Sequence, residues 1–242
     1  MRSSLPTDSD VLALMRDREP DITGRSKKLW RLSDGLCAVE LIPSLRSFTY
    51  DRDEVVEDTG PLRVDFYERA AEHLEKAGVR TAFVRRLTPI AYLAEFHEPP
   101  PFEVIVKNRA VGSTLVKYPG LFEPDAPLPR PIVKFDYRTD PEDQPIGEDY
   151  LRALGLPVEQ MSQRAFAVNE VLRDWLAPVE VVDFCVIFGL DGAEPVLISE
   201  VSQDCIRMRH PDGSSLDKDL FRRGAPGEQI VAAWRRVLDE TV

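Results

Sequence analysis

Cysteine and histidine are scarce in this chain of 242 residues, which has three of each. They are Cys37, Cys185 and Cys205, and His73, His97 and His210. No two of them form a CxxC pair or have the Cys/His spacing of a zinc site, and an odd number of cysteines does not suit a disulfide framework. We therefore expect reduced thiols and histidines that are structural or solvated.

Long hydrophobic runs are also absent. The chain is 43% hydrophobic and 30% charged, with a mean hydropathy of -0.25, and no apolar run approaches the roughly 20 residues that a membrane helix needs. The N-terminal segment has no basic region followed by a long apolar stretch and a small-residue cleavage site, as a secretory signal would. We expect a soluble, cytoplasmic protein with no membrane role.

Positive charge is in deficit, with 31 Lys and Arg residues against 42 Asp and Glu residues. The resulting net charge of -11 and pI of about 4.9 predict broad repulsion from a nucleic-acid backbone. A small anionic ligand remains compatible with this balance, because a local cluster of Arg and Lys can dominate inside one cleft.

The order of predicted elements indicates an α+β protein of two packed sheets. Two apolar runs in 28–42 are separated by Ser33-Asp34-Gly35, a strong hairpin signal. Apolar residues recur at helical spacing across 60–78, where Gly78 ends the pattern, and across 159–176. Further elements are expected as a short helix or loose arm within 1–20, strands at 81–87, 91–96 and 102–106, a hairpin over 179–202 turned at Asp191-Gly192, and a helix at 228–238.

The triple proline at 99–101 is the predicted domain boundary, because proline has no N–H to donate to a β-ladder. It would divide the chain into an N-terminal antiparallel β domain with one main helix (1–98) and a larger α+β nucleotide- and substrate-binding domain (99–242). The proline-rich stretch 119–131 is expected to be a surface loop.

Short motifs of one known family follow one another along nearly the whole chain from Gly24 onward. GRSKKLW (24–30) resembles GKAKxVY, VKNRAVGS (106–113) resembles VVRNxAAGS, and VDFCVIFGLDG (182–192) resembles VDFKLEFGxxxG. Three more segments match in order, PIVKFDYRTD (131–140), SEVSQDCIRMR (199–209) and LDKDLFRR (216–223). Because the segments are collinear, chance similarity is implausible, and the chain resembles the SAICAR synthetase family.

This resemblance implies a two-domain α+β fold with an N-terminal antiparallel sheet domain and a larger ATP-grasp-like domain. It also implies ligase chemistry, in which ATP phosphorylates a substrate carboxylate and the amine of aspartate then displaces phosphate to form an amide. ATP and magnesium are the implied cofactors, and a phosphoribosyl nucleotide is the implied partner. Family members are often oligomeric, so the resemblance is compatible with a homo-oligomer, although the sequence does not fix the oligomeric state.

Three cations correspond to family lysines that hold ATP phosphates. The two opening lysines correspond to Arg25 and Lys27, and a third corresponds to Arg138, so the charge is kept while a compact ammonium becomes a planar guanidinium at two positions. The alternative is that Arg25 and Lys27 merely flank a solvated strand edge. We favour the phosphate role because Gly24 permits close backbone approach.

The family's ribose-phosphate anchors correspond to Ser47, Lys107, Ser113 and Arg207. Hydroxyls and cations gathered in one cleft are what a phosphomonoester requires. Ser47 could instead be a turn residue, and Arg207 could instead form a surface ion pair with Asp204.

The amine-side and metal-side positions depart from the family. Cys185 and Ile187 replace the family's Lys and Glu, and Ser199 replaces an Asp that helps to bind metal. Magnesium prefers one or two carboxylates, which leaves Glu200 as a weak metal ligand and Asp183 as a distant second. We expect Glu200, Asp183 and Arg138 to form the catalytic set.

Two further departures affect the expected nucleotide site. Gln144 replaces the acidic member of a family Asp-Pro pair, and the prolines at 99–101 remove backbone N–H donors from the segment beside adenine. Cys185 could be a nucleophile, although a buried cysteine acting as a small apolar residue is commoner.

The leading hypothesis is thus a family enzyme acting on a phosphoribosyl-imidazole or purine-like nucleotide in specialised nucleoside-analogue biosynthesis. A genuine SAICAR synthetase and a non-catalytic nucleotide-binding protein are the alternatives.

Overall fold

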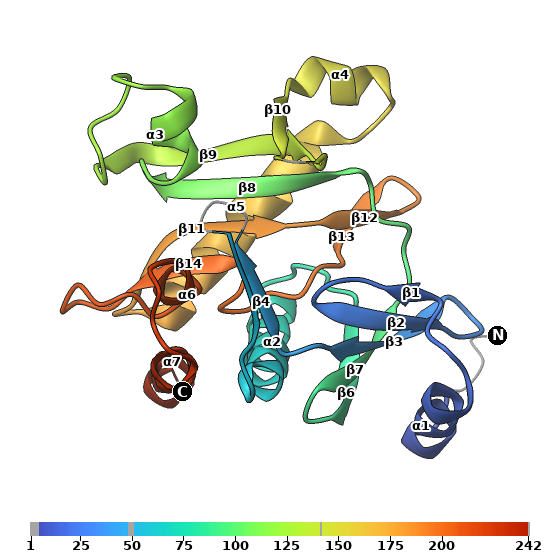
Figure 1. The fold of residues 1–242 in the computed structure, drawn as a ribbon. Helices are drawn as coiled ribbons and strands as arrows, with labels where there is room; N and C mark the ends of the chain where they lie inside the picture. Colours follow the sequence, from blue (N-terminus) through green and yellow to red (C-terminus); the bar gives the residue numbers. More distant parts are fainter. Residues whose placement is uncertain (1–4, 48–50, 141, 242) are drawn as a thin grey trace.

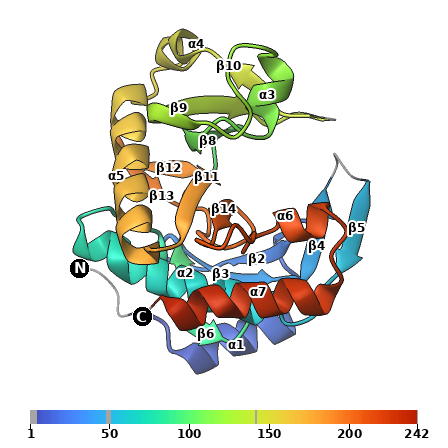
Figure 2. The ribbon, with the colours of Figure 1, turned by 90° about the vertical axis from the view of Figure 1, so that its left-hand side faces the viewer.

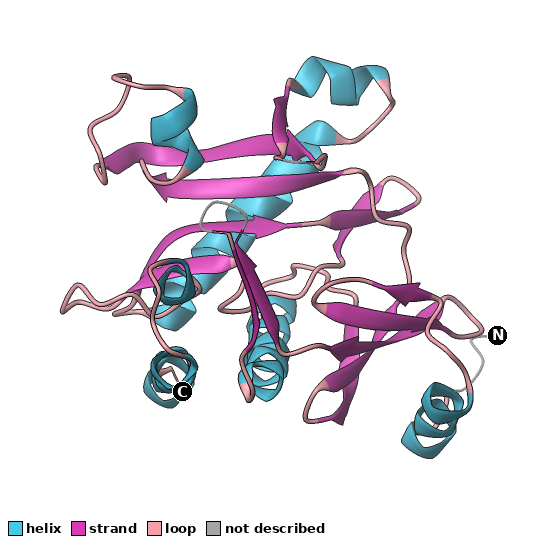
Figure 3. Cartoon of the chain, in the orientation of Figure 1, coloured by secondary structure: helices cyan, strands magenta, loops and turns pink. Residues whose placement is uncertain are grey.

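A computed structural model describes residues 5–47, 51–140 and 142–241 (Figure 1). Its strands form two five-stranded antiparallel sheets and two two-stranded ribbons within these residues. Figure 3 shows the larger helices lying against the sheets rather than forming a separate bundle. This arrangement confirms the α+β class with two main sheets.

The N-terminal sheet has the strand order β1-β2-β3-β7-β6. The strands are β1 (Ile22–Thr23), β2 (Lys27–Arg31), β3 (Leu36–Leu41), β6 (Phe83–Thr88) and β7 (Ala91–Glu95). The predicted hairpin is confirmed as β2 and β3, which pair Leu29 with Val39. Asp34 and Gly35 turn the chain with φ values of 59° and 71°, the left-handed geometry that an Asp-Gly turn favours.

Helices cover both faces of this sheet. Val39 and Leu41 of β3 join the main core with α2 (Thr59–Lys76), whereas Leu36 and Ala38 join a second cluster with Val11 of α1 (Asp8–Asp17). Because successive strand residues point to opposite faces, this alternation places the two helices on opposite sides of the sheet. The predicted helix at 60–78 is confirmed, and the N-terminal segment forms the short helix rather than a loose arm.

The C-terminal sheet has the strand order β10-β9-β8-β11-β14. The strands are β8 (Phe102–Arg109), β9 (Pro127–Tyr137), β10 (Gln144–Ile146), β11 (Glu180–Val186) and β14 (Ile206–Arg209). Helix α5 (Val158–Leu176) runs across one face of this sheet (Figure 2) and contacts β8, β9 and β11. It confirms the predicted helix at 159–176.

The face of this sheet away from α5 carries the polar side chains. Val104 and Phe184 belong to the core together with α5, so the alternate residues of β8 and β11 point the other way. Lys107 pairs in register with Asp183, and Ile105 with Cys185. Strand alternation thereby collects a cation, a carboxylate and a thiol on one face of the sheet, where Lys107 and Asp183 are both buried.

The remaining elements complete the chain. They are the ribbon of β4 (Ser44–Ser47) and β5 (Arg52–Val55), the hairpin of β12 (Phe188–Asp191) and β13 (Glu194–Leu197), and helices α3 (Ser113–Lys117), α4 (Glu148–Ala153), α6 (Asp219–Arg222) and α7 (Gly227–Glu240). Helix α7 confirms the predicted closing helix and packs against α2. None of the described helices is both long and apolar enough to cross a membrane.

Two expectations about strands need correction. The stretch 119–131 is not wholly a loop, because β9 begins at Pro127. Among the described residues, the first half of β9 pairs with β8 alone, since β10 pairs with 135–137. Prolines are tolerated there because the missing N–H groups face an open edge.

The apolar run 179–190 is likewise not one strand but two, β11 and β12. The ladder breaks at Ile187, whose N–H donates to the Ser199 hydroxyl at 2.9 Å and whose carbonyl accepts from Ile198 at 2.9 Å. The hairpin turned at Asp191-Gly192 is confirmed as β12 and β13.

The division into domains at residue 99 stays a prediction. Residues 99–101 do lie between the last strand of one sheet and the first of the other. Helix α2, however, packs against both α5 and α7, so the two predicted domains share one hydrophobic core.

Candidate functional site

A pocket of about 110 Å³ lies between the two sheets, where β2 and α2 meet the end of β11. It is lined by Ser26, Lys27, Arg63, Glu103, Cys185, Val186, Ile187, Ser199, Glu200, Asp204 and Cys205. These residues come from segments up to 179 positions apart, from Ser26 to Cys205. The pocket therefore exists only because the N-terminal and C-terminal sheets pack together.

A buried ion pair forms one wall of this pocket. Arg63 Nε lies 2.7 Å from Glu200 Oε1, and the side chains are 1% and 6% exposed. The Ser202 hydroxyl donates to the same Glu200 oxygen at 2.9 Å. Burial would raise the pKa of Glu200, but the charges of Arg63 and Lys27 outweigh burial and hold its pKa below the usual range. Glu200 is therefore a carboxylate with its negative charge already balanced by the protein.

Of the two predicted nucleotide cations in the opening segment, Lys27 lines the pocket. Its Nζ lies 3.7 Å from Glu200 Oε2, and its side chain is 38% exposed. Arg25 is exposed, and its carbonyl accepts a hydrogen bond from the Ser44 hydroxyl. Arg25 does not line this pocket, so the structure brings only one of these two cations into the pocket wall.

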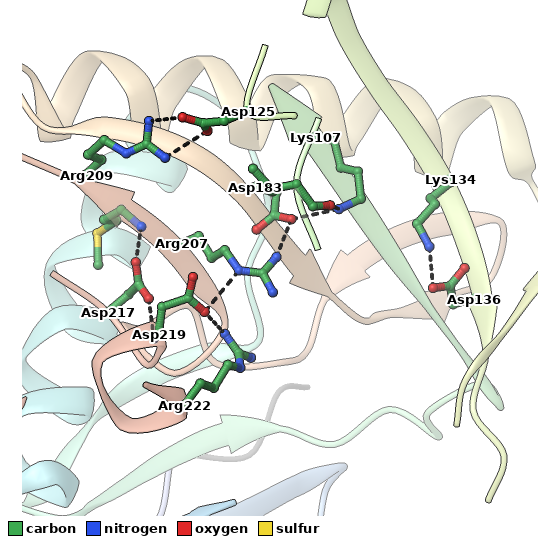
Figure 4. Close-up of polar contacts among 12 residues, drawn as sticks. Lys107, Asp125, Lys134, Asp136, Asp183, Arg207, Arg209, Asp217, Asp219 and Arg222 are labelled. Carbon is green, nitrogen blue, oxygen red and sulfur yellow. Dashed lines mark hydrogen bonds and ion pairs between the residues drawn. The ribbon is translucent and has the colours of Figure 1, made fainter. Parts of the chain in front are cut away.

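The predicted phosphate anchors Lys107 and Arg207 meet at one carboxylate (Figure 4). Lys107 Nζ and Arg207 Nη1 lie 2.8 and 2.7 Å from the same oxygen of Asp183. Arg207 Nε also lies 3.2 Å from Asp219, which pairs with Arg222. We call these five residues the Asp183 cluster.

Three cations face two carboxylates in the Asp183 cluster. The neighbouring Asp217 also acts on Arg207, but burial, followed by the Asp219 charge, raises the pKa of Asp217 to about 7 and so weakens its negative charge. Burial would raise the pKa of Asp219, but Arg207 and Arg222 hold it below the usual range. The alternative interpretation paired Arg207 with Asp204, and this is wrong. Asp204 pairs with Lys218 at 2.8 Å. A positively charged cluster surrounded by an acidic protein is suited to an anion.

The glycine before Ser113 also belongs to this region. A Cβ placed on Gly112 would lie 3.0 Å from Arg207 Nη1, so the loop approaches the guanidinium closely. Ser113 begins α3, and Lys107 Nζ reaches the Val111 carbonyl at 3.3 Å. Three of the four predicted anchors, Lys107, Ser113 and Arg207, thus lie in one neighbourhood.

The fourth anchor, Ser47, is buried at the end of β4. Strand β4 contacts α6, which holds Asp219 of the Asp183 cluster. Ser47 is therefore on a neighbouring element, and its part in phosphate binding stays a prediction.

The predicted catalytic residues are not in one place. Glu200 is in the pocket, Asp183 is in the Asp183 cluster, and Arg138 is exposed with its guanidinium donating to the Pro100 carbonyl. Arg138 thus ties the end of β9 to the proline segment. Asp183 bridges two cations, which suits an orienting role for the carboxylate. Catalytic roles for all three stay predictions.

Two cysteines of the pocket are thiols rather than thiolates. Burial, followed by the nearby Glu103 charge, raises the pKa of Cys185 well above its ordinary value. Burial likewise raises the pKa of Cys205 to about 12, and its Sγ donates to the Ser202 carbonyl at 3.3 Å. These environments favour the interpretation of Cys185 as a small apolar side chain.

The family implies magnesium, and the residues present do not fit a protein-bound divalent cation. Within 5–47, 51–140 and 142–241, no group of three or more His, Cys, Asp or Glu side chains is arranged to hold a metal ion. Glu200 is paired with Arg63, Asp204 is paired with Lys218, and Ile187 offers no oxygen ligand from its side chain. The predicted metal role of Glu200 stays untested, and this geometry weighs against it.

Sequence reasoning missed Arg63 and Glu103. Arg63 lies four residues before Tyr67 on the buried stripe of α2, and a charged residue at a core-facing helix position signals a buried partner. Glu103 faces the pocket from β8, where burial, followed by Asp143 and Asp136, raises its pKa to about 7. Only the register of β8 could have indicated that position.

Comparison with known proteins identifies the family of this chain. The family model described as SAICAR synthetase matches residues 21–240. The phosphoribosylaminoimidazole-succinocarboxamide synthase of Methanocaldococcus jannaschii is 31% identical over 231 residues, which cover 92% of this chain and 94% of that protein.

Solved structures have the same fold. A SAICAR synthetase in complex with ADP superposes with a TM-score of 0.84 at 27% identity, covering 91% of this chain and 97% of the other. The SAICAR synthetase of Pyrococcus horikoshii OT3 superposes with a TM-score of 0.82 at 27% identity, covering 89% and 97%. The chain therefore belongs to the SAICAR synthetase family, whose members are ATP-dependent ligases that form a C–N bond.

Proposed function

We propose that this chain is an ATP-dependent ligase that joins an amine to the carboxylate of a phosphoribosyl imidazole, with carboxyaminoimidazole ribotide and aspartate as the first substrates to test. The similarity to phosphoribosylaminoimidazole-succinocarboxamide synthases over 92% of the chain supports this reaction. The ADP complex of a structural relative at 27% identity supports ATP as the nucleotide.

The observation that carries the proposal is the Asp183 cluster. Lys107 and Arg207 share one oxygen of Asp183, and the Gly112 backbone approaches the Arg207 guanidinium closely. A phosphate that enters here can take charge-assisted hydrogen bonds from both cations, while Asp183 keeps their side chains in position. The ribose phosphate of the substrate is the natural occupant, because anchoring it positions the reacting carboxylate for ATP.

The reaction then proceeds in two balanced steps. A carboxylate oxygen of the substrate attacks the γ-phosphorus of ATP, an O–P bond forms, and ADP leaves. The amine nitrogen next attacks the acyl carbon, the C–O bond to phosphate breaks, and the amine loses a proton. Glu103 lines the pocket with a pKa of about 7 and is suited to accept that proton. Lys27 supplies positive charge for the phosphoryl group, while Arg63 offsets the charge of Glu200 beside it.

The test is a coupled assay with carboxyaminoimidazole ribotide, ATP and aspartate. Formation of ADP, phosphate and the succinocarboxamide in equal amounts supports the proposal. Tight nucleotide binding with no turnover of any amine would instead favour a non-catalytic nucleotide-binding protein.

A second candidate is a related enzyme of specialised nucleoside-analogue biosynthesis. The observation that favours it is the pocket wall made by Cys185, Ile187 and Ser199, where the family has polar groups on the amine and metal sides. If the ribotide binds but aspartate does not react, assays with other amines and with purine-like nucleotides decide between the two. Cytoplasmic location and a homo-oligomeric state stay predictions.

A further inference from the structure

The two oxygens of Glu200 have different surroundings. Oε1 accepts from Arg63 Nε at 2.7 Å and from the Ser202 hydroxyl at 2.9 Å. Oε2 is buried and has no hydrogen-bond partner, and Lys27 Nζ lies 3.7 Å away from it. A buried carboxylate oxygen without a partner marks a place where a ligand group can bind.

Arg63 is held where it is by the fold. Its side chain is almost fully buried on α2, and its Nη1 donates to the Ile42 carbonyl at 3.2 Å. Burial opposes its charge, but Glu200 and then Asp204 raise the pKa of Arg63 above its ordinary value. Arg63 is therefore a permanent cation in contact with Glu200.

The charge around Glu200 is unfavourable for a metal ion. Lys27, Arg63 and Lys218 are cations close to Glu200 or Asp204, so the cations outnumber these two carboxylates. A magnesium ion needs near-octahedral oxygen ligands and one or two carboxylates. At Oε2 it would meet one carboxylate oxygen and the Lys27 ammonium, which repels it.

We propose that Arg63 replaces a divalent metal in this pocket. Its charge is paired with Glu200, so that Glu200 is no metal ligand, and Lys27, whose side chain is 38% exposed, is the cation that meets the phosphates of the nucleotide. The Oε2 atom of Glu200 then accepts a hydrogen bond from a ligand group. Alternatively it accepts one from Lys27, when a bound phosphate draws the Lys27 side chain inward. This proposal rests on the proposed function only in taking ATP as the nucleotide.

The first test measures metal binding without nucleotide, by electron paramagnetic resonance of Mn²⁺ titrated into the full-length protein. Wild type and Glu200→Gln should bind Mn²⁺ equally weakly. Arg63→Gln should gain a Mn²⁺ site at least about fivefold tighter, because Glu200 is then unpaired, and adding Glu200→Gln should abolish that site. A wild-type site that Glu200→Gln weakens tenfold or more overturns the proposal.

Removing one member of a buried pair can prevent folding. The Arg63→Met, Glu200→Gln double variant removes both charges and keeps side chains of similar volume. It is the variant to measure when the single variants do not fold. Its Mn²⁺ binding should equal that of wild type, and loss of a wild-type site in this variant also overturns the proposal. Arg63→Lys is the conservative control, and it should gain no Mn²⁺ site.

The second test compares ATP dissociation constants by calorimetry in EDTA and in magnesium. For wild type, the two dissociation constants should agree within about threefold. Arg63→Gln should lose about tenfold or more in ATP affinity in EDTA and should recover part of that affinity in magnesium. A wild-type affinity that depends on magnesium by a hundredfold contradicts the proposal. Failure to bind ATP under both conditions contradicts ATP use in the proposed function, while the Mn²⁺ result still decides the role of Glu200.

Discussion

Gly112 packs directly against the guanidinium of Arg207, and a Cβ at this glycine would lie 3.0 Å from Nη1 and 3.1 Å from Nη2. The backbone of Gly112 also has a φ of 58°, in the left-handed region that glycine adopts without strain. Both the loop conformation and the position of Arg207 thus depend on a residue without a side chain.

Gly112→Ala should weaken binding of a phosphorylated nucleotide about tenfold or more, because the methyl group displaces Arg207 from Asp183. Isothermal calorimetry with a ribotide measures this. Gly120→Ala is a matched control, since Gly120 has a φ of 77° but nothing within 4 Å of an added Cβ. Gly120→Ala should cost about 1–2 kcal/mol of unfolding free energy, and Gly112→Ala should cost at least as much, but only Gly112→Ala should affect the ligand. Equal affinity in the two variants would contradict this role of Gly112.

Lys107→Ala and Arg207→Ala should each reduce affinity for a phosphoribosyl-imidazole nucleotide by about one to two orders of magnitude, because each removes a charge-assisted donor. Affinity for the dephosphorylated nucleoside should change little. Arg209→Ala is the control, because Arg209 lies on the same strand as Arg207 but pairs with Asp125. If both variants lose nucleotide and nucleoside affinity equally, these residues maintain the fold rather than bind the phosphate.

Glu103→Gln should stabilise the protein at pH 8 and make little difference at pH 4. Burial raises the pKa of Glu103 from 4.5 to about 7, so the folded state binds the proton more tightly than the unfolded state. The stability that protonated Glu103 contributes is fully present below about pH 4.5 and is lost as the pH rises to about 7. The loss amounts to up to ~3 kcal/mol of unfolding free energy.

Urea unfolding at pH 4, 6 and 8 tests this expectation. Wild type should lose more unfolding free energy between pH 4 and pH 8 than Glu103→Gln does. Glu170→Gln, a change at an exposed position of α5, should follow the wild-type curve. Parallel curves for wild type and Glu103→Gln would show that Glu103 titrates normally.

The triple change Cys185→Lys, Ile187→Glu and Ser199→Asp should increase the response of ATP binding to magnesium. It adds two carboxylates to the pocket, and the carboxylate introduced at position 199 keeps an acceptor for the backbone N–H of position 187, which the Ser199 hydroxyl now satisfies. Calorimetry with and without magnesium measures the response, after circular dichroism has shown that the variant is folded. An unchanged response would mean that the departure from the family extends beyond these three positions.

Helices α2 and α5 and the β2–β3 hairpin could be predicted from the sequence, because each depends on signals a few residues apart. Apolar spacing of three and four residues marks the helices, and Asp34-Gly35 marks the turn. The motif order from Gly24 onward likewise identified the family and pointed to Lys107 and Arg207.

The tertiary structure alone decided which charges meet. Arg63 and Glu200 are 137 positions apart, and Lys107 and Asp183 are 76 apart, so no local pattern links them. Their pairing follows from the packing of α2 under the N-terminal sheet and from the register of β8 with β11. The motifs predicted an anion site, but whether Glu200 faces a metal or an arginine depends on how α2 packs, because a buried carboxylate takes its charge partner from whichever element packs against it.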